Sequence, residues 1–177
     1  GNTGGYVEAR DFEKDISGNL LITGYVSTGN YADILLLKYN ENGQLLFSRQ
    51  YDTTSEGGWA LTTDLYGNIF VIGDGSGLGT TSIVLKYDPS GNLIWKSTIA
   101  VNYADWFPVD IKWDRNNIYV AGDVYDNDGY DIYLAKYNSS GIRQWLKRYN
   151  SPSDSFDVVN KIQIDNAGSI YLCGVSF

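Results

Sequence analysis

The sequence contains no histidine and no methionine, and it has a single cysteine. Without histidine, imidazole-based catalytic triads are excluded, and the commonest general base and the usual zinc ligand are missing. One cysteine excludes an internal disulfide and leaves the redox compartment open. Because position 1 is not methionine and no signal peptide is recognisable, we expect a processed protein or an internal piece of a longer one.

Positive charge and long apolar runs are also scarce. Thirteen Lys and Arg residues against 21 Asp and Glu give a formal net charge of −8. This charge would repel phosphate backbones, so we do not expect nucleic acid as a partner. The apolar stretches are only about four or five residues long, which excludes insertion into a membrane by an apolar helix. A hydrophobic fraction of 43% is typical of a globular domain.

A short apolar run that closes on glycine occurs four times, at intervals of about 50 residues. The four runs are Leu20–Gly24, Ile69–Gly73, Ile118–Gly122 and Ile170–Gly174. A fixed period of this length is the signature of a repeat architecture. We therefore predict one repeat domain over residues 1–177. Its repeats are approximately 5–54, 55–101, 102–150 and 151–177, the last being half a unit.

Each complete copy predicts four short strands. The first ends on an aspartate before a tight turn, and the second is the run that ends on glycine. The third ends on Lys-Tyr, and the fourth carries an aromatic residue that we expect to pack between neighbouring sheets. The aspartates, interpreted as turn residues, are Asp15, Asp64, Asp114 and Asp165. The fourth-strand aromatics are Phe47, Trp95 and Trp145.

Four-stranded antiparallel units with a period of about 40 to 50 residues are the blades of a β-propeller. The order Asp-x-x-Gly-Asn, apolar strand with Gly, Lys-Tyr, Gly, Trp resembles the extracellular β-propeller repeat family of bacteria and archaea, the seven-bladed propeller or SBBP type. The likeness runs from about Tyr6 to Gly174, and is weakest in the first strand and at Thr81, where other copies have Asp33 and Asp131. The resemblance implies an extracellular or cell-surface scaffold with no enzymatic activity of its own.

The predicted fold class is therefore all-β, a partial β-propeller of three four-stranded antiparallel blades plus half a fourth. A closed propeller needs about four to eight blades. Blade faces without a neighbour expose apolar surface, and such surface marks a partner. The blades that complete the ring belong to a longer propeller, or copies of this chain associate into a homo-oligomeric ring or fibre. A compact monomer with this blade number is a third alternative.

We expect ligand recognition at the end of the blades where the variable connections gather. Tyrosine, tryptophan and aspartate are frequent there, and flat aromatic rings suit protein loops or sugar rings. The predicted ligand-binding residues, for a protein or glycan, are Tyr25, Tyr31, Tyr103, Asp105, Trp106, Tyr125 and Tyr130. The alternative is that these side chains only cover the ends of the sheets.

One of these connections, residues 123–131, crowds carboxylates around a glycine. Asp126, Asp128 and Asp131 are candidate ligands for Ca²⁺, which prefers oxygen donors. The EF-hand order would need another ligand at Val124, and only one copy has the cluster. An acidic hairpin loop is therefore the favoured interpretation, and we expect no other cofactor.

Catalysis is poorly supported by the sequence. Cys173 occupies the strand position of Thr23, Ile72 and Ala121, which predicts a small core residue and not a nucleophile. Carboxylate pairs in the loops are the groups that glycosidases use, but no spacing supports that chemistry. A quinoprotein-like enzyme is another alternative, because Gly91 to Trp95 resembles a tryptophan-docking repeat. That alternative needs cofactor-binding residues that the sequence does not identify.

Overall fold

The computed structural model describes residues 5–27, 32–52, 57–75, 81–99, 105–126, 129–152 and 156–176. The regular elements of these residues are β-strands, and each strand runs antiparallel to its neighbours in the same sheet. The described residues contain no helix with the length and apolar character needed to cross a membrane. The predicted all-β class is thus confirmed, as are its four-stranded antiparallel sheets.

In the described part of the chain, three sheets have four strands and one has two, in chain order. The first comprises β1 (Tyr6–Lys14), β2 (Leu20–Ser27), β3 (Ala32–Tyr39) and β4 (Leu45–Tyr51). The second comprises β5 (Gly58–Thr63), β6 (Ile69–Gly75), β7 (Thr81–Tyr87) and β8 (Leu93–Ile99). The third comprises β9 (Asp105–Asp114), β10 (Asn117–Asp126), β11 (Gly129–Asn138) and β12 (Arg143–Tyr149). The fourth comprises β13 (Asp157–Ile164) and β14 (Ile170–Ser176).

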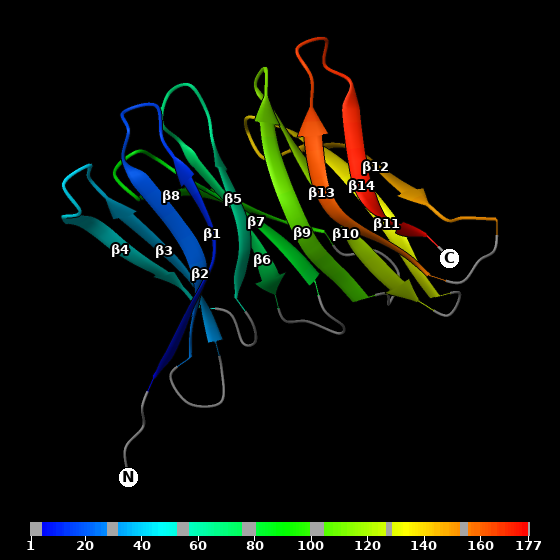
Figure 1. The fold of residues 1–177 in the computed structure, drawn as a ribbon, viewed down its shortest axis with the longest axis horizontal. Helices are drawn as coiled ribbons and strands as arrows, with labels where there is room; N and C mark the ends of the chain where they lie inside the picture. The colour runs from blue at the N-terminus through cyan, green and yellow to red at the C-terminus, as the bar shows by residue number, and fades with distance from the viewer. Residues whose placement is uncertain are drawn as a thin grey trace.

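Neighbouring sheets pack face to face in an open row (Figure 1). The first strand of each sheet lies against the first and second strands of the sheet before it: β5 contacts β1 and β2, β9 contacts β5 and β6, and β13 contacts β9 and β10. Three apolar clusters fill the spaces between successive sheets. The cluster between the first and second sheets, for example, joins Leu21 and Leu36 to Leu61 and Val71. Burial of apolar surface between sheets is therefore the main stabilising contact.

The turns repeat because one side chain organises each of them. Asp15 Oδ1 accepts hydrogen bonds from the backbone N–H groups of Ser17 and Asn19, at 2.9 Å each. Gly18 then takes a positive φ of 82°, which glycine adopts without strain. Asp64 and Asp165 make the same pair of bonds, so their predicted role in turns is confirmed. Asn or Asp does the same in the third-to-fourth hairpins, at Asn40, Asp88 and Asn138.

The third copy makes a tighter turn. Asp114 and Asn117 are paired, which leaves only Arg115 and Asn116 between the strands. Both have a positive φ, of 46° and 65°, as a two-residue type I′ hairpin turn requires. The third copy therefore has a different turn type, and the pairing of its first and second strands is retained.

The glycine that ends each apolar run faces a β-bulge in the first strand. At Gly24, Gly122 and Gly174 an added Cβ would lie 1.9 to 2.1 Å from a carbonyl oxygen of that strand. The register shifts opposite each of them, because the first strand carries one extra residue there. The repeated glycine is thus needed for close approach of two backbones.

Two sequence expectations are wrong. Cys173 lies in the predicted strand but is exposed, whereas its counterparts Thr23, Ile72 and Ala121 are fully buried. Among the described residues, no further sheet packs against this face of β14. The connection expected over residues 123–131 is also shorter, because β10 continues to Asp126 and β11 begins at Gly129.

Candidate functional site

The two ends of the sheets, at which the strands begin and end, differ in their connections. We call the "turn end" the end that carries the Asn and Asp turns just described. The opposite end, where β1, β5, β9 and β13 begin, is called the "loop end". It holds Tyr25, Asp105, Trp106, Tyr125, Tyr130 and Asp131. Tyr31, Tyr103 and Asp128, and the side chain of Asp126, lie outside the described part of the chain.

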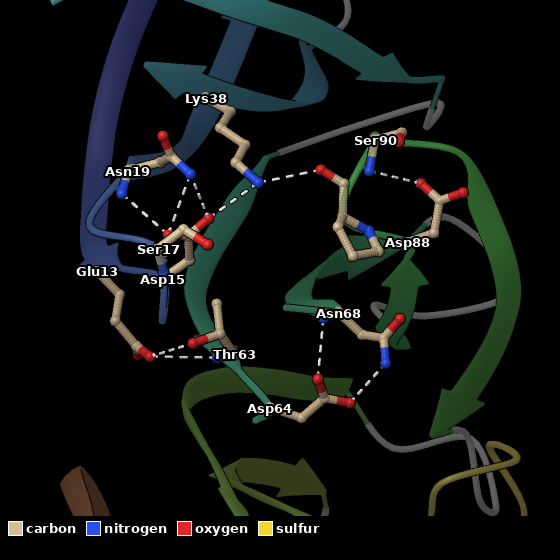
Figure 2. A network of polar contacts seen from close by, with 11 residues as sticks. Glu13, Asp15, Ser17, Asn19, Lys38, Thr63, Asp64, Asn68, Asp88 and Ser90 are labelled. Atoms are coloured by element: carbon tan, nitrogen blue, oxygen red, sulfur yellow. Dashed lines mark hydrogen bonds and ion pairs between the residues drawn. The ribbon is translucent and has the colours of Figure 1, made fainter. Parts of the chain in front are cut away.

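Side chains of the turn end serve the packing between sheets (Figure 2). Asp15 forms a buried ion pair with Lys38, at 2.9 Å between Oδ2 and Nζ. The same ammonium group donates to the carbonyl of Pro89 in the next sheet, at 3.0 Å. Burial acts to raise the pKa of Asp15, but hydrogen bonds from Asn19 and Lys38 outweigh it and hold the pKa below its usual value. These polar groups are used internally, so the turn end is a structural region.

At the loop end of the third sheet, four aromatic rings form one continuous group. Tyr125 and Tyr130 face each other across β10 and β11, with ring centroids 4.7 Å apart. Tyr130 also contacts Phe107 at 6.2 Å and Phe156 at 5.2 Å. Tyr125 is 46% exposed and Phe156 is 39% exposed. We call these four residues the aromatic cluster. Backbone pairing places its central Tyr130 opposite Tyr125 and in a bridge with Phe156.

The sequence named two members of the aromatic cluster and missed two. Phe107 is the residue after Trp106, and successive side chains of a strand point to opposite faces. Trp106 points into the core, where it is 2% exposed and stacks edge-on against Tyr133 at 5.1 Å. Trp106 is therefore not part of the exposed surface. Because a bulge in β9 interrupts the alternation of side chains, it is difficult to predict from the sequence which of these two residues faces the core.

Tyr25 belongs to a separate arrangement on the first sheet. The Arg10 guanidinium lies between two rings, 3.7 Å from the centroid of Trp59 and 5.1 Å from that of Tyr25. Glu8 accepts hydrogen bonds from the hydroxyls of Tyr6 and Tyr25, at 3.0 and 3.2 Å. The bond from Tyr6 lowers the pKa of Glu8. Tyr25 is half-buried and already has partners, so it offers less free surface than Tyr125.

The acidic residues do not assemble into a cation site in the described part of the chain. Asp131 is buried and accepts a hydrogen bond from Arg148 Nε at 3.1 Å, which neutralises its charge. The described residues contain no group of three acidic or cysteine side chains that could hold a metal. Asp105 is half-buried at the start of β9. The calcium hypothesis thus has no support from Asp131, while Asp126 and Asp128 are not placed.

Asp123 lies beside the aromatic cluster on β10 and connects two sheets. Its Oδ1 accepts the backbone N–H of Val159 in β13, at 2.8 Å. Burial raises its pKa to about 6, since desolvation disfavours the charged carboxylate. Asp74, its counterpart in the second sheet, accepts the indole N–H of Trp59 instead. Both carboxylates thus accept a hydrogen bond from a neighbouring strand, from a backbone N–H at Asp123 and from an indole N–H at Asp74.

Comparison with known proteins gives no family assignment: no protein-family model matches this chain, and no curated protein matches it.

Proposed function

We propose that this chain is a non-enzymatic binding and scaffold module, a partial β-propeller of the extracellular repeat type. The propeller interpretation is supported by successive four-stranded antiparallel sheets in which each first strand lies against the preceding sheet. An extracellular or cell-surface location rests on the resemblance of the repeat pattern. The absence of histidine is consistent with a function in recognition, because it removes the commonest general base.

The observation that carries the proposal is the aromatic cluster at the loop end. It presents two rings that are more than a third exposed, Tyr125 on β10 and Phe156, which forms a bridge with Tyr130 of β11. Rigid aromatic rings provide contact area at low conformational-entropy cost and stack on the apolar faces of sugars or on protein side chains. The ligand is therefore a protein loop or a glycan that presents a flat apolar face.

The test is a screen of the chain against a glycan array and a phage-displayed peptide library. Hits should lose at least about tenfold in affinity in the double variant Tyr125→Ala, Tyr130→Ala, since aromatic contacts contribute more than about 1 kcal/mol each. The matched control is Tyr66→Ala, which removes a 74% exposed tyrosine at the turn end. Failure to find hits, or equal loss in the control, would contradict recognition by the loop end.

A second candidate function is self-assembly through open faces of the sheets. Phe12 is 73% exposed, whereas Leu61, Ile111 and Ile162 at the same position of the later sheets are fully buried. Phe12 lines a hollow of about 430 Å³ together with Leu20 and Ile22. The same two residues also line a second hollow of about 530 Å³, with Tyr39 and Gly43. Self-assembly requires that light scattering give a solution mass above the 19.7 kDa of one chain. The variant Phe12→Ser should then have the mass of a monomer. A monomeric wild-type chain would contradict it.

A further inference from the structure

In the described residues, β14 has no third strand beside it. Its edge, together with the adjoining face of β11 and β12, forms a candidate binding site. We propose that it binds a β-hairpin from outside residues 1–177, one that carries the Lys-Tyr-Asx-x-Ser-Gly sequence pattern of a third and fourth strand. The inference rests on the blade-like stacking proposed above. It adds the identity of the partner segment and the register in which it pairs.

The first observation is that β14 is incomplete when compared with its counterparts. The strands β2, β6 and β10 each pair on both sides, whereas in the described residues β14 pairs with β13 only. Tyr171 of β14 is 57% exposed, but Leu21 and Phe70 at the same position are fully buried, and Tyr119 is 7% exposed. An unpaired strand edge of this kind is a template for strand addition.

The second observation is a contact that both complete interfaces share. Lys38 Nζ donates to the carbonyl of Pro89, and Lys86 Nζ donates to that of Ser139, at 3.0 and 3.3 Å. In each case a third-strand lysine binds the third-to-fourth turn of the next sheet (Figure 2 shows Lys38). The contact is thus a repeated part of how one sheet receives the next.

An aromatic residue accompanies this lysine at both interfaces. A Cβ on Gly91 would lie 3.0 Å from the ring of Phe47, and one on Gly141 would lie 2.7 Å from that of Trp95. The indole N–H of Trp95 also donates to the carbonyl of Ser139, at 3.1 Å. The ring of one sheet therefore sits against the turn glycine of the next, where no side chain fits.

The third sheet has the same two residues in place. Lys136 precedes Tyr137 in β11, and Trp145 stands opposite Lys136 in β12. The Lys136 ammonium lies 5.5 Å above the ring of Tyr119, which in turn contacts Trp145 at 6.2 Å. Trp145 is only partly buried at the margin of the last apolar cluster. Lys136 and Trp145 are thus positioned to contact a Ser-Gly turn, in the same way as Lys86 and Trp95 contact the turn of the third sheet.

The register of the incoming strand follows from the three complete sheets. The pairs Leu20–Tyr39, Ile69–Tyr87 and Ile118–Tyr137 align the second strand with the tyrosine that ends the third. Ile170 of β14 should therefore face that tyrosine in the partner hairpin. Ala121 faces Leu134, so the equivalent Cys173 should face the residue that corresponds to Leu134.

Cys173 makes this register measurable, because it is exposed and is the single cysteine of the chain. The probe is a synthetic peptide of residues 129–150, with Leu134→Cys, incubated with the full chain in a glutathione redox buffer. We expect a mixed disulfide with Cys173 at a yield at least tenfold above that of the peptide with Ala135→Cys. That control places its thiol on the opposite face of the strand.

Two variants separate specific docking from random thiol exchange. Trp145→Ala in the full chain should reduce the yield about tenfold, and Trp145→Phe should restore most of it. Gly141→Val in the peptide should reduce the yield similarly, because its Cβ would meet the receiving ring. Equal yields for Leu134→Cys and Ala135→Cys, or no effect of Trp145→Ala, would overturn the proposal.

Solution mass and loop-end binding complete the experiment. A wild-type chain that forms disulfide-linked or stable dimers without peptide would show that residues 1–177 of a second copy cover the edge, which overturns a hairpin from outside these residues. Glycan or peptide hits that bind the loop end while no crosslink forms would refute the hairpin site and leave the binding module intact. Crosslinking without such hits would support the hairpin site and count against the loop-end function.

Discussion

The second and fourth sheets begin with the same sequence pattern but have very different surroundings. In β6, between two sheets, every residue is buried, while in β14 only Ile170 is even half-buried. Both strands pair with a bulged first strand, and their glycines, Gly73 and Gly174, lie at the register shift. The comparison shows that the repeat encodes the hairpin locally, whereas burial is decided by the neighbouring sheet.

The largest expected difference between the two sheets concerns equivalent aromatic residues. Phe70→Ala should destabilise the chain by about 3 to 5 kcal/mol, because it leaves a cavity in a core where Phe70 is fully buried. Tyr171→Ala, at the same position of β14, should change stability by less than about 0.5 kcal/mol. Urea unfolding followed by tryptophan fluorescence measures both. Similar losses would mean that β14 is covered in solution.

A smaller effect is expected from two turn glycines in neighbouring sheets. Gly43 and Gly91 have nearly the same φ, 75° and 80°, so alanine imposes a similar backbone strain of about 1 kcal/mol at each. At Gly43 the new Cβ meets nothing within 4 Å, but at Gly91 it meets the ring of Phe47 at 3.0 Å. Gly91→Ala should therefore cost about 1 kcal/mol more than Gly43→Ala. Equal shifts in the urea midpoint would show that the aromatic contact is not tightly packed.

The smallest effect concerns Asp123, which joins the third and fourth sheets. Its folded-state pKa of about 6 lies above the ordinary value of 3.8, so the folded state holds this proton more tightly than the unfolded state. The contribution of Asp123 to the free energy of unfolding is greatest below about pH 4 and is lost as the pH rises through about 6. Because the side chain is partly exposed to solvent, we expect the free energy of unfolding to change by only about 1 kcal/mol over this pH range.

Asp123→Asn should remove that pH dependence, because the amide oxygen still accepts the Val159 N–H but does not titrate. The measurement is the difference in unfolding free energy between variant and wild type at pH 4 and pH 7. Glu41→Gln, an exposed change at the turn end, is the control. A difference between Asp123→Asn and wild type that does not change with pH would show that Asp123 stays ionised in the folded chain.

Most of the strand order could be predicted from the sequence, but less of the candidate site. Asp15 and Gly18 define their turn through contacts within five residues, so a local pattern suffices. Trp106 was expected at the surface and lies in the core, because the bulge in β9 and the strand's two-residue period decide which way it points. Phe107 and Phe156 joined the aromatic cluster without any sequence signal beyond their proximity to the loops.

The sequence by itself determined the period, the strand boundaries near each turn, and the glycines that permit bulges and positive φ. These features follow from backbone geometry and hydrogen bonds between residues close in the chain. Only the tertiary structure decided that Cys173 is exposed, that Arg10 lies between two rings, and that Tyr125, Tyr130 and Phe156 meet. Those outcomes depend on which sheet lies against which, and apolar burial between sheets is non-directional, so a local pattern does not specify them.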